Sequence, residues 1–346
     1  MSRLERLGST IDEPLLVTYG VNVRYLTGFD SSNCALLVEP GGQTTLYTDF
    51  RYLEAAQAVE GVDVVRTPRD VVGALAELLT GRRVGFEAAR LTYAQWETID
   101  AGGADLVPTR GVVENLRAVK EAREVDAIRR ACAVSDAVYG ALAEEPLVGR
   151  SEADVARWIE RAFLDHGAEG LAFDSIVASG ENGSRPHAGA SGAVIPEGTL
   201  VTVDMGCLLD GYCSDCTRTF ATGDLPAQLA EAYTLVSDAQ LAGLAAVRPG
   251  RQGREVDADS RVGIEAAGLG EAYGHGLGHG LGLEVHESPT LRPESGDVLE
   301  PGNVVSVEPG LYLPGVGGCR IEDLVVVTDA GCEILTHYTK ELVTVA

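Results

Sequence analysis

Long apolar segments and positive charge are both scarce in this sequence. No stretch approaches the roughly 20 consecutive apolar residues that span a bilayer, and no apolar run follows the charges of the N-terminal segment MSRLERLGSTIDEP. The 27 Lys and Arg residues are outnumbered by 52 Asp and Glu residues, which gives a formal net charge of −25. Such a charge repels phosphate backbones and anionic lipid headgroups. We therefore expect a cytoplasmic protein with no nucleic-acid or membrane partner.

Cysteine is also sparse, with seven residues in a chain of 346. An odd number spread thinly along a long chain does not resemble a disulfide framework. Cys213 and Cys216 form a C-x-x-C motif, which alone could indicate redox or zinc chemistry. In a strand, however, a spacing of three places the two side chains on opposite faces. The motif therefore favours ordinary strand residues over a thiol site.

The length of the chain predicts about two domains. Its first third alternates short apolar runs with segments of helical periodicity, which is an α/β pattern. We place the first domain at residues 1–117. The expected strands are 15–18, 35–38, 44–47, 62–66 and 83–86, and the expected helices are 49–59, 71–79 and 93–99.

The second domain is placed at residues 118–346, because a long helical pattern begins at Lys120 and runs to Leu142. Further helices are expected over 152–166, with Ser151 as N-cap, and over 226–247. The other C-terminal segments are interpreted as β-branched strands separated by Gly-rich turns. Helices that bracket a mostly antiparallel sheet predict an α+β domain.

An internal repeat runs through the second domain. Residues 198–206 (GTLVTVDMG) align with residues 302–310 (GNVVSVEPG), and each apolar strand ends in an acid, Asp204 or Glu308. A second strand follows each copy and carries another acid, Asp215 or Glu322. The repeat predicts two related halves that bring four carboxylates to one place.

The first acidic pair can be positioned from its turn. A two-residue hairpin turn at Asp210-Gly211 pairs Asp204 with Thr217. Asp215 shares a face with Thr217 and so becomes a diagonal neighbour of Asp204, roughly 7 Å away between side-chain roots. A lone Asp is usually a turn or surface acid, but an acid inside the apolar strand TLVTVDMG must be paired or bound to metal.

Histidines gather in the segment 274–287, GHGLGHGLGLEVHE, which holds His275, His279 and His286. Its many glycines argue against a helix, so the first two histidines do not form the helical zinc motif. The glycines also lack the strand and helix that flank a dinucleotide fingerprint. A single His here would more often be structural, but three of them beside four convergent acids favour a role in chemistry.

The remaining two acids have ordinary alternatives. Glu308 could be a strand-end acid before Pro309, and Glu322 could pair with Arg320 on the same face. Together, however, two Asp, two Glu and at least one His form an oxygen-rich set. Such a set suits two divalent ions better than a closed thiolate zinc site.

These motifs resemble those of the proline-specific M24 metallopeptidases, the aminopeptidase P and prolidase group with the pita-bread fold. The matching segments are VTVDMG, YCSDCTRTF, GHGLGHGLGLEVHE, VVSVEPGLYLPG and RIEDLVVVT, with NVRYLTGF and TDFRYLEAA in the first domain. The resemblance implies a small α/β N-terminal domain like that of creatinase and prolidase, followed by an α+β pita-bread catalytic domain. It also implies a homodimer.

The resemblance further implies the role of each site residue. Two divalent metal ions, Mn²⁺ first and Co²⁺, Zn²⁺ or Fe²⁺ as alternatives, would be bound with Asp215 and Glu322 bridging them; the implied ligands are Asp204, Asp215, His279, Glu308 and Glu322. A hydroxide between the ions would be the nucleophile, and Glu308 would take the proton of the bridging water and pass it to the leaving proline nitrogen. The implied catalytic histidines are His187, at the substrate carbonyl, and His286, at the tetrahedral intermediate, and the supporting residues are His275 and Arg320.

The implied activity is removal of the N-terminal residue from peptides with proline in second position, as in an Xaa-Pro aminopeptidase. The alternatives are an Xaa-Pro dipeptidase, a methionine aminopeptidase and an inactive pita-bread binding protein. Prolidase-like relatives often carry an arginine where this chain has Thr290, and threonine cannot neutralise a dipeptide carboxylate. That difference favours the aminopeptidase, although Arg292 or a dimer partner could supply the charge.

Overall fold

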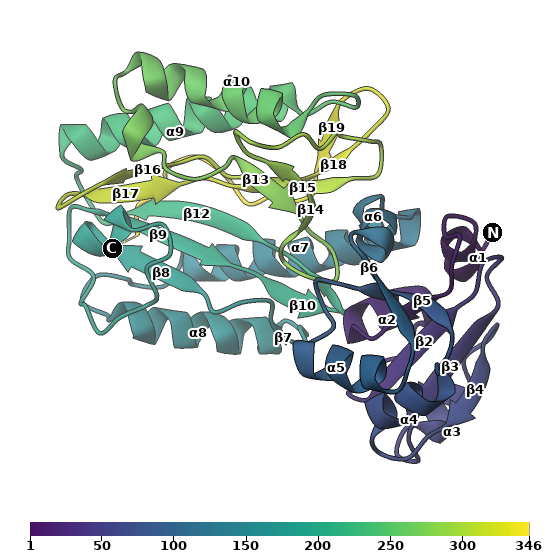
Figure 1. Ribbon diagram of the computed structural model, residues 1–346. Coiled ribbons are helices and arrows are strands. Elements are labelled where there is room, and N and C mark those ends of the chain that lie inside the picture. The colour runs from purple at the N-terminus through teal and green to yellow at the C-terminus, as the bar shows by residue number, and fades with distance from the viewer. Residues whose placement is uncertain (346) are drawn as a thin grey trace. The chain divides into compact units, whose positions relative to one another are not determined.

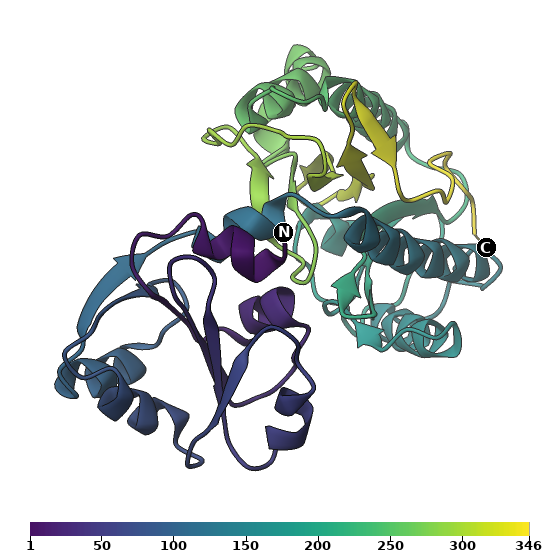
Figure 2. The same ribbon diagram turned by 90° about the vertical axis from the view of Figure 1, so that its right-hand side faces the viewer.

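The computed structural model describes residues 1–345, and the chain divides into two compact units, Met1–Arg117 and Ala118–Ala346. The first unit is built on a six-stranded sheet in the order β4-β3-β2-β1-β5-β6, with helices on both faces (Figures 1 and 2). Its strands are β1 (Leu15–Val17), β2 (Cys34–Val38), β3 (Thr44–Thr48), β4 (Asp63–Arg66), β5 (Arg83–Glu87) and β6 (Asp105–Thr109). Pairs β1–β2 and β2–β3 are antiparallel, and the other three pairs are parallel.

The helices of this region are α1 (Arg3–Gly8), α2 (Gly20–Thr27), α3 (Leu53–Gln57), α4 (Val71–Leu78), α5 (Tyr93–Ala101) and α6 (Val112–Ala118). Apolar side chains of α4 and α5 pack on the sheet, among them Leu75 and Ile99.

The strands expected from the sequence are confirmed, whereas α1, α2, α6 and β6 were not predicted. The helix expected over 49–59 is shorter because Asp49 forms a turn: its carboxylate accepts hydrogen bonds from the backbone and side chain of Arg51.

The second unit has helices on two sides of its strands (Figure 1). These are α7 (Ala122–Leu142), α8 (Glu152–Asp165), α9 (Ala227–Ala246) and α10 (Gly253–Ala266). Helices α7 and α8 share one apolar core with strands β8 (Ile176–Ser179), β9 (Leu200–Met205) and β12 (Cys216–Ala221), and α9 shares another with β16 (Gly310–Leu313) and β17 (Gly317–Arg320). The Ser151 N-cap of α8 is confirmed, since its hydroxyl accepts from the backbone N–H of Asp154.

The prediction of strands for all remaining C-terminal segments is wrong at α10. A capping box between Gln252 and Glu255 starts this helix, and Val256, Ser260 and Ile264 bury one face at a spacing of four residues.

The strands of the second unit are short and every named pair is antiparallel. Those of the first half are β7 (Gly170–Leu171), β8 (Ile176–Ser179), β9 (Leu200–Met205), β10 (Cys207–Leu209), β11 (Tyr212–Cys213) and β12 (Cys216–Ala221). Those of the second half are β13 (Gly278–Gly280), β14 (Glu287–Leu291), β15 (Val304–Val307), β16 (Gly310–Leu313), β17 (Gly317–Arg320), β18 (Asp323–Val327) and β19 (Cys332–Ile334). The 3₁₀ turns are η1 (Gly180–Ser184) and η2 (Gly270–Ala272).

The predicted hairpin register is confirmed. Asp210 and Gly211 have φ values of 51° and 75°, as a two-residue turn of the hairpin type requires. Asp204 faces Thr217 across the β9–β12 pair. The repeat also has a structural counterpart, because β15 pairs with β18 as β9 pairs with β12. Within residues 1–345, no helix combines the length and apolarity needed to cross a lipid bilayer.

Candidate metal centre

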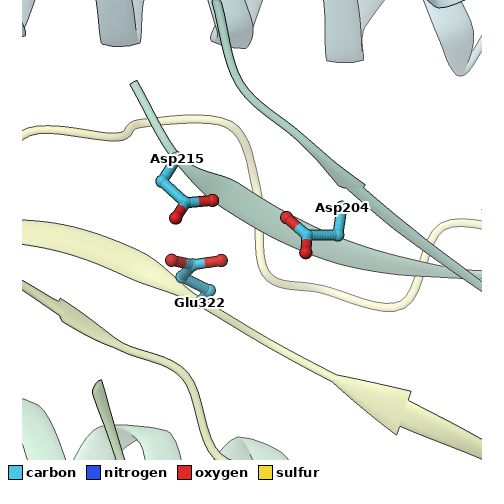
Figure 3. Close-up of side chains that lie close together, drawn as sticks. All are labelled: Asp204, Asp215 and Glu322. Atoms are coloured by element: carbon cyan, nitrogen blue, oxygen red, sulfur yellow. The ribbon is translucent and has the colours of Figure 1, made fainter. Parts of the chain in front are cut away.

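Three carboxylates from distant parts of the sequence meet inside the second unit. Asp204 lies in β9, Asp215 directly precedes β12, and Glu322 directly precedes β18. One oxygen atom of each lies within 4.8 Å of the other two, and all three residues are buried. Figure 3 shows the carboxylate groups of Asp215 and Glu322 close together, with that of Asp204 beside them. The register of two strand pairs therefore produces the convergence that the repeat predicted.

The electrostatics of this group fit a divalent cation. Burial, followed by the charges of the neighbouring carboxylates, raises the pKa of Asp215 and of Glu322 well above the usual range. Burial also raises the pKa of Asp204, although Arg320 opposes the shift. Asp204 Oδ1 and Glu322 Oε1 are buried without a hydrogen-bond partner among the described residues. Buried acids that repel one another and leave oxygens unpaired are costly unless a cation joins them.

His279 and Glu308 lie next to the three carboxylates. His279 Nε2 is 3.7 Å from Asp215 Oδ2 and 3.2 Å from Glu308 Oε1. His279 Nδ1 lies 3.0 Å from the carbonyl oxygen of Gly280, an arrangement that directs Nε2 toward the acids. Burial disfavours ionisation of Glu308, but its hydrogen bond to His279 and nearby positive charges outweigh burial and lower the pKa of Glu308 to about 2. All five predicted ligands are thus brought to one place.

Arg320 ties these acids to their surroundings. Its Nη2 donates to Asp204 Oδ2 at 2.7 Å, and its Nε lies 3.9 Å from Glu308 Oε2. Its Nε also donates to Thr217 Oγ1, and the Thr217 hydroxyl in turn donates to Glu322 Oε2 at 2.8 Å. The alternative in which Arg320 merely pairs with Glu322 is therefore not what the structure shows.

Three supporting hydroxyl groups were not singled out from the sequence. Ser306 Oγ accepts from the backbone N–H of His279 and donates to Glu308 Oε1. Tyr312 OH accepts from Arg320 Nη1 at 2.9 Å. The predicted register could have identified Thr217, which faces Asp204, whereas nothing in the local pattern around Tyr312 indicated its partner.

Three further histidines predicted from the sequence, His275, His286 and His187, lie outside the three-carboxylate cluster. His275 Nε2 lies 2.8 Å from Tyr312 OH, and burial lowers its pKa. His286 is exposed, and its ring centre is 4.3 Å from that of His279. Burial and then the charge of His279 lower the pKa of His286; Glu308 opposes this shift, and His187 adds a smaller lowering. His187 is exposed and lies between η1 and β9.

The C-x-x-C motif provides no ligand to this cluster. Cys213 ends β11 and Cys216 begins β12, and their Sγ atoms approach the carbonyl oxygens of Leu283 and Glu322 respectively. Burial raises the pKa of Cys213 to about 12 and that of Cys216 well above its usual value. Thiols that remain protonated are poor metal ligands and poor nucleophiles. All seven cysteines are free.

Comparison with known proteins gives two family matches. The model described as Metallopeptidase family M24 matches residues 126–329, and the Creatinase/Prolidase N-terminal domain matches residues 6–119. The chain is 34% identical to the Xaa-Pro dipeptidase of Pyrococcus furiosus over 98% of this chain and 99% of the relative. The solved Xaa-Pro dipeptidase from Bacillus anthracis is 38% identical with a TM-score of 0.94, covering 99% of both chains. The X-Pro aminopeptidase from Thermotoga maritima is 30% identical with a TM-score of 0.90, covering 99% of this chain and 100% of the other.

These comparisons favour the dipeptidase alternative over the aminopeptidase interpretation. The structure also weakens the argument based on Thr290. Its Oγ1 lies 3.0 Å from Asp297 Oδ2 and 3.1 Å from Ser295 Oγ, and its backbone N–H donates to the same Asp297 oxygen. The Thr290 hydroxyl thus serves a local turn, so the absence of arginine there says little about how a substrate carboxylate is bound.

Proposed function

Because the chain belongs to metallopeptidase family M24, we propose that it is an Xaa-Pro dipeptidase, which hydrolyses dipeptides with proline in second position. The family implies divalent metal ions. The observation that supports a catalytic centre most strongly is the buried cluster of Asp204, Asp215 and Glu322 with its two unpaired oxygens. The restriction to dipeptides is supported by what similar proteins are named.

We propose that two divalent cations are held by the five residues predicted as ligands, with Asp215 and Glu322 shared between them: Asp204, Asp215, His279, Glu308 and Glu322. When bound, the cations supply Lewis acidity, which lowers the pKa of a water molecule and polarises the scissile carbonyl. Arg320 keeps Asp204 Oδ2 oriented through its 2.7 Å hydrogen bond. Thr217 does the same for Glu322 Oε2.

The chain's own acid–base and hydrogen-bonding groups would complete the reaction. Glu308 Oε1, which is held by Ser306, takes a proton from the attacking water and delivers it to the leaving proline nitrogen. His286 has a lowered pKa, so at neutral pH its imidazole is uncharged and donates one hydrogen bond to the developing oxyanion. His187 binds the substrate carbonyl, and His275 supports the site through Tyr312, whose hydroxyl contacts both His275 Nε2 and Arg320 Nη1.

Substrate length tests the dipeptidase assignment. We expect the dipeptide Ala-Pro to be hydrolysed with a kcat/KM about 10- to 100-fold above that of Ala-Pro-amide and of Ala-Pro-Ala. A charge-assisted contact to the free carboxylate contributes about 1.5 to 3 kcal/mol, which corresponds to this ratio. The amide is the matched control, because it removes the charge without adding a residue.

An Xaa-Pro aminopeptidase is the second candidate, supported by the similarity to the X-Pro aminopeptidase from Thermotoga maritima. Equal or faster hydrolysis of Ala-Pro-Ala would establish it and contradict the dipeptidase.

The preference for Mn²⁺, the homodimer and the cytoplasmic location stay predictions. We further propose that the two compact units, residues 1–117 and 118–346, are the N-terminal and catalytic domains.

A further inference from the structure

One buried carboxylate, that of Glu152, binds both ends of the segment that carries His187. Glu152 is the first residue of α8 and its exposed fraction is 0%. Its Oε1 accepts from the backbone N–H and the hydroxyl of Ser179, at 2.8 and 2.9 Å. Its Oε2 accepts from Asn182 Nδ2 at 2.9 Å and from the hydroxyl and backbone N–H of Ser191, at 2.6 and 3.2 Å. Ser179 ends β8, whereas Ser191 lies beyond His187.

The segment between these attachment points has little regular structure of its own. After η1, no helix or strand occurs until β9 begins at Leu200. It contacts the metal centre at two places: η1 packs against β17, which ends at Arg320, and the carbonyl oxygen of Pro186 accepts from Arg320 Nη1 at 3.1 Å. The neighbouring His187 contributes to the lowered pKa of His286. The part of the segment after η1, which carries His187, would sample many conformations unless its far end were also fixed.

The position of Glu152 makes it an effective anchor. A carboxylate in the first turn of a helix is favoured by the helix dipole, and burial without compensating donors would be very costly. Here donors from three residues satisfy both oxygens. The backbone strengthens the far attachment, because the N–H groups of Glu152 and Ala153 donate to the carbonyl oxygens of Ala193 and Ser191.

We propose that Glu152 is a positioning residue for catalysis: it fixes the 180–190 segment so that His187 stays within reach of a substrate bound at the metal centre. This inference rests on the proposed function, because His187 is taken as the residue that binds the substrate carbonyl. Glu152 itself touches neither substrate nor metal ligand. It acts through Ser179, Asn182 and Ser191.

Glu152→Gln tests the proposal with a side chain of the same shape. The amide NH₂ would replace one acceptor and face the donors of Asn182 and Ser191. We expect kcat/KM for Ala-Pro to fall about 10- to 100-fold, as misplacement of a catalytic group commonly does. Bound metal per chain should not change, and faster hydrogen–deuterium exchange should be confined to residues 180–193.

The matched control is Glu87→Gln in the first unit. Glu87 is also buried and accepts from two backbone N–H groups and from Asn22 Nδ2. It should leave kcat/KM and the exchange of residues 180–193 unchanged. Ser191→Ala loosens only the far attachment and should give a smaller change of the same kind, which keeps the test valid if Glu152→Gln does not fold.

A double-mutant cycle with His187→Ala separates positioning from general stability. If Glu152 acts through His187, Glu152→Gln should lower kcat/KM little further in the His187→Ala background. Fully additive losses, lost metal, or exchange that rises throughout the second unit would overturn the proposal. If His187→Ala alone left kcat/KM unchanged, the assigned role of His187 would fail, whereas the exchange pattern of Glu152→Gln would still report whether the anchor exists.

Discussion

Replacing Asp215 by Asn, or Glu322 by Gln, is expected to empty the metal centre and lower kcat/KM by about 10³-fold or more. Each side chain is proposed to be shared by two cations, so one substitution weakens the binding of both. The Lewis acidity that is then lost contributes several kcal/mol to stabilisation of the transition state. Metal analysis after dialysis and hydrolysis of Ala-Pro are the measurements.

Thermal unfolding distinguishes loss of a ligand from misfolding in these variants. Without metal, burial and neighbouring carboxylates raise the pKa of Asp215, which means that a neutral group is preferred there. The metal-free Asp215→Asn protein should therefore be at least as stable as the metal-free parent. Added Mn²⁺ should raise the melting temperature of the parent but not that of the variant.

The matched control for these variants is Asp210→Asn. This exposed turn residue has a positive φ that asparagine tolerates, so metal content and activity should not change. An Asp215→Asn enzyme that retains full metal and full activity would refute the bridging assignment.

His286→Ala is expected to lower kcat by about 10²- to 10³-fold while the metal content stays at the parental level. The loss is that of one hydrogen-bond donor to the oxyanion. His286 is exposed and its ring lies beside that of His279, so its removal should disturb the buried core little. Steady-state kinetics with metal analysis are the measurements.

His337→Ala, at another exposed histidine, is the control and should behave like the parent. If the His286→Ala variant lost bound metal as well as kcat, His286 would be a metal ligand. That result would contradict its proposed role at the oxyanion.

Local sequence signals predicted the first half of the site well. The turn at Asp210-Gly211 is encoded by adjacent residues, and strand geometry carries its register to Asp204 and Thr217 without further information. The acids of the second half were found because the repeat supplied a template. The two halves are joined at the site by a backbone hydrogen bond from the N–H of Glu322 to the carbonyl oxygen of Thr217, which the repeat alone does not predict.

Features that depend on distant partners were not predictable in the same way. Glu152 reads as an ordinary first-turn acid, because its partners lie 27 to 39 residues further along the chain. The role of Tyr312 depends on packing against His275 and Arg320. The residue type at Thr290 suggested the aminopeptidase, but it does not reveal that the Thr290 hydroxyl is hydrogen-bonded to Asp297.

A metal titration of the chelated protein tests whether this chain is, as proposed, a metal-dependent dipeptidase. Protein stripped of divalent ions should not hydrolyse Ala-Pro, and activity should return and saturate at about two Mn²⁺ per chain. Because the pKa values of Asp215 and Glu322 are raised without metal, binding should release protons and weaken as the pH falls. Full hydrolysis of Ala-Pro by protein whose metal content is shown to be negligible would rule out metal-dependent catalysis.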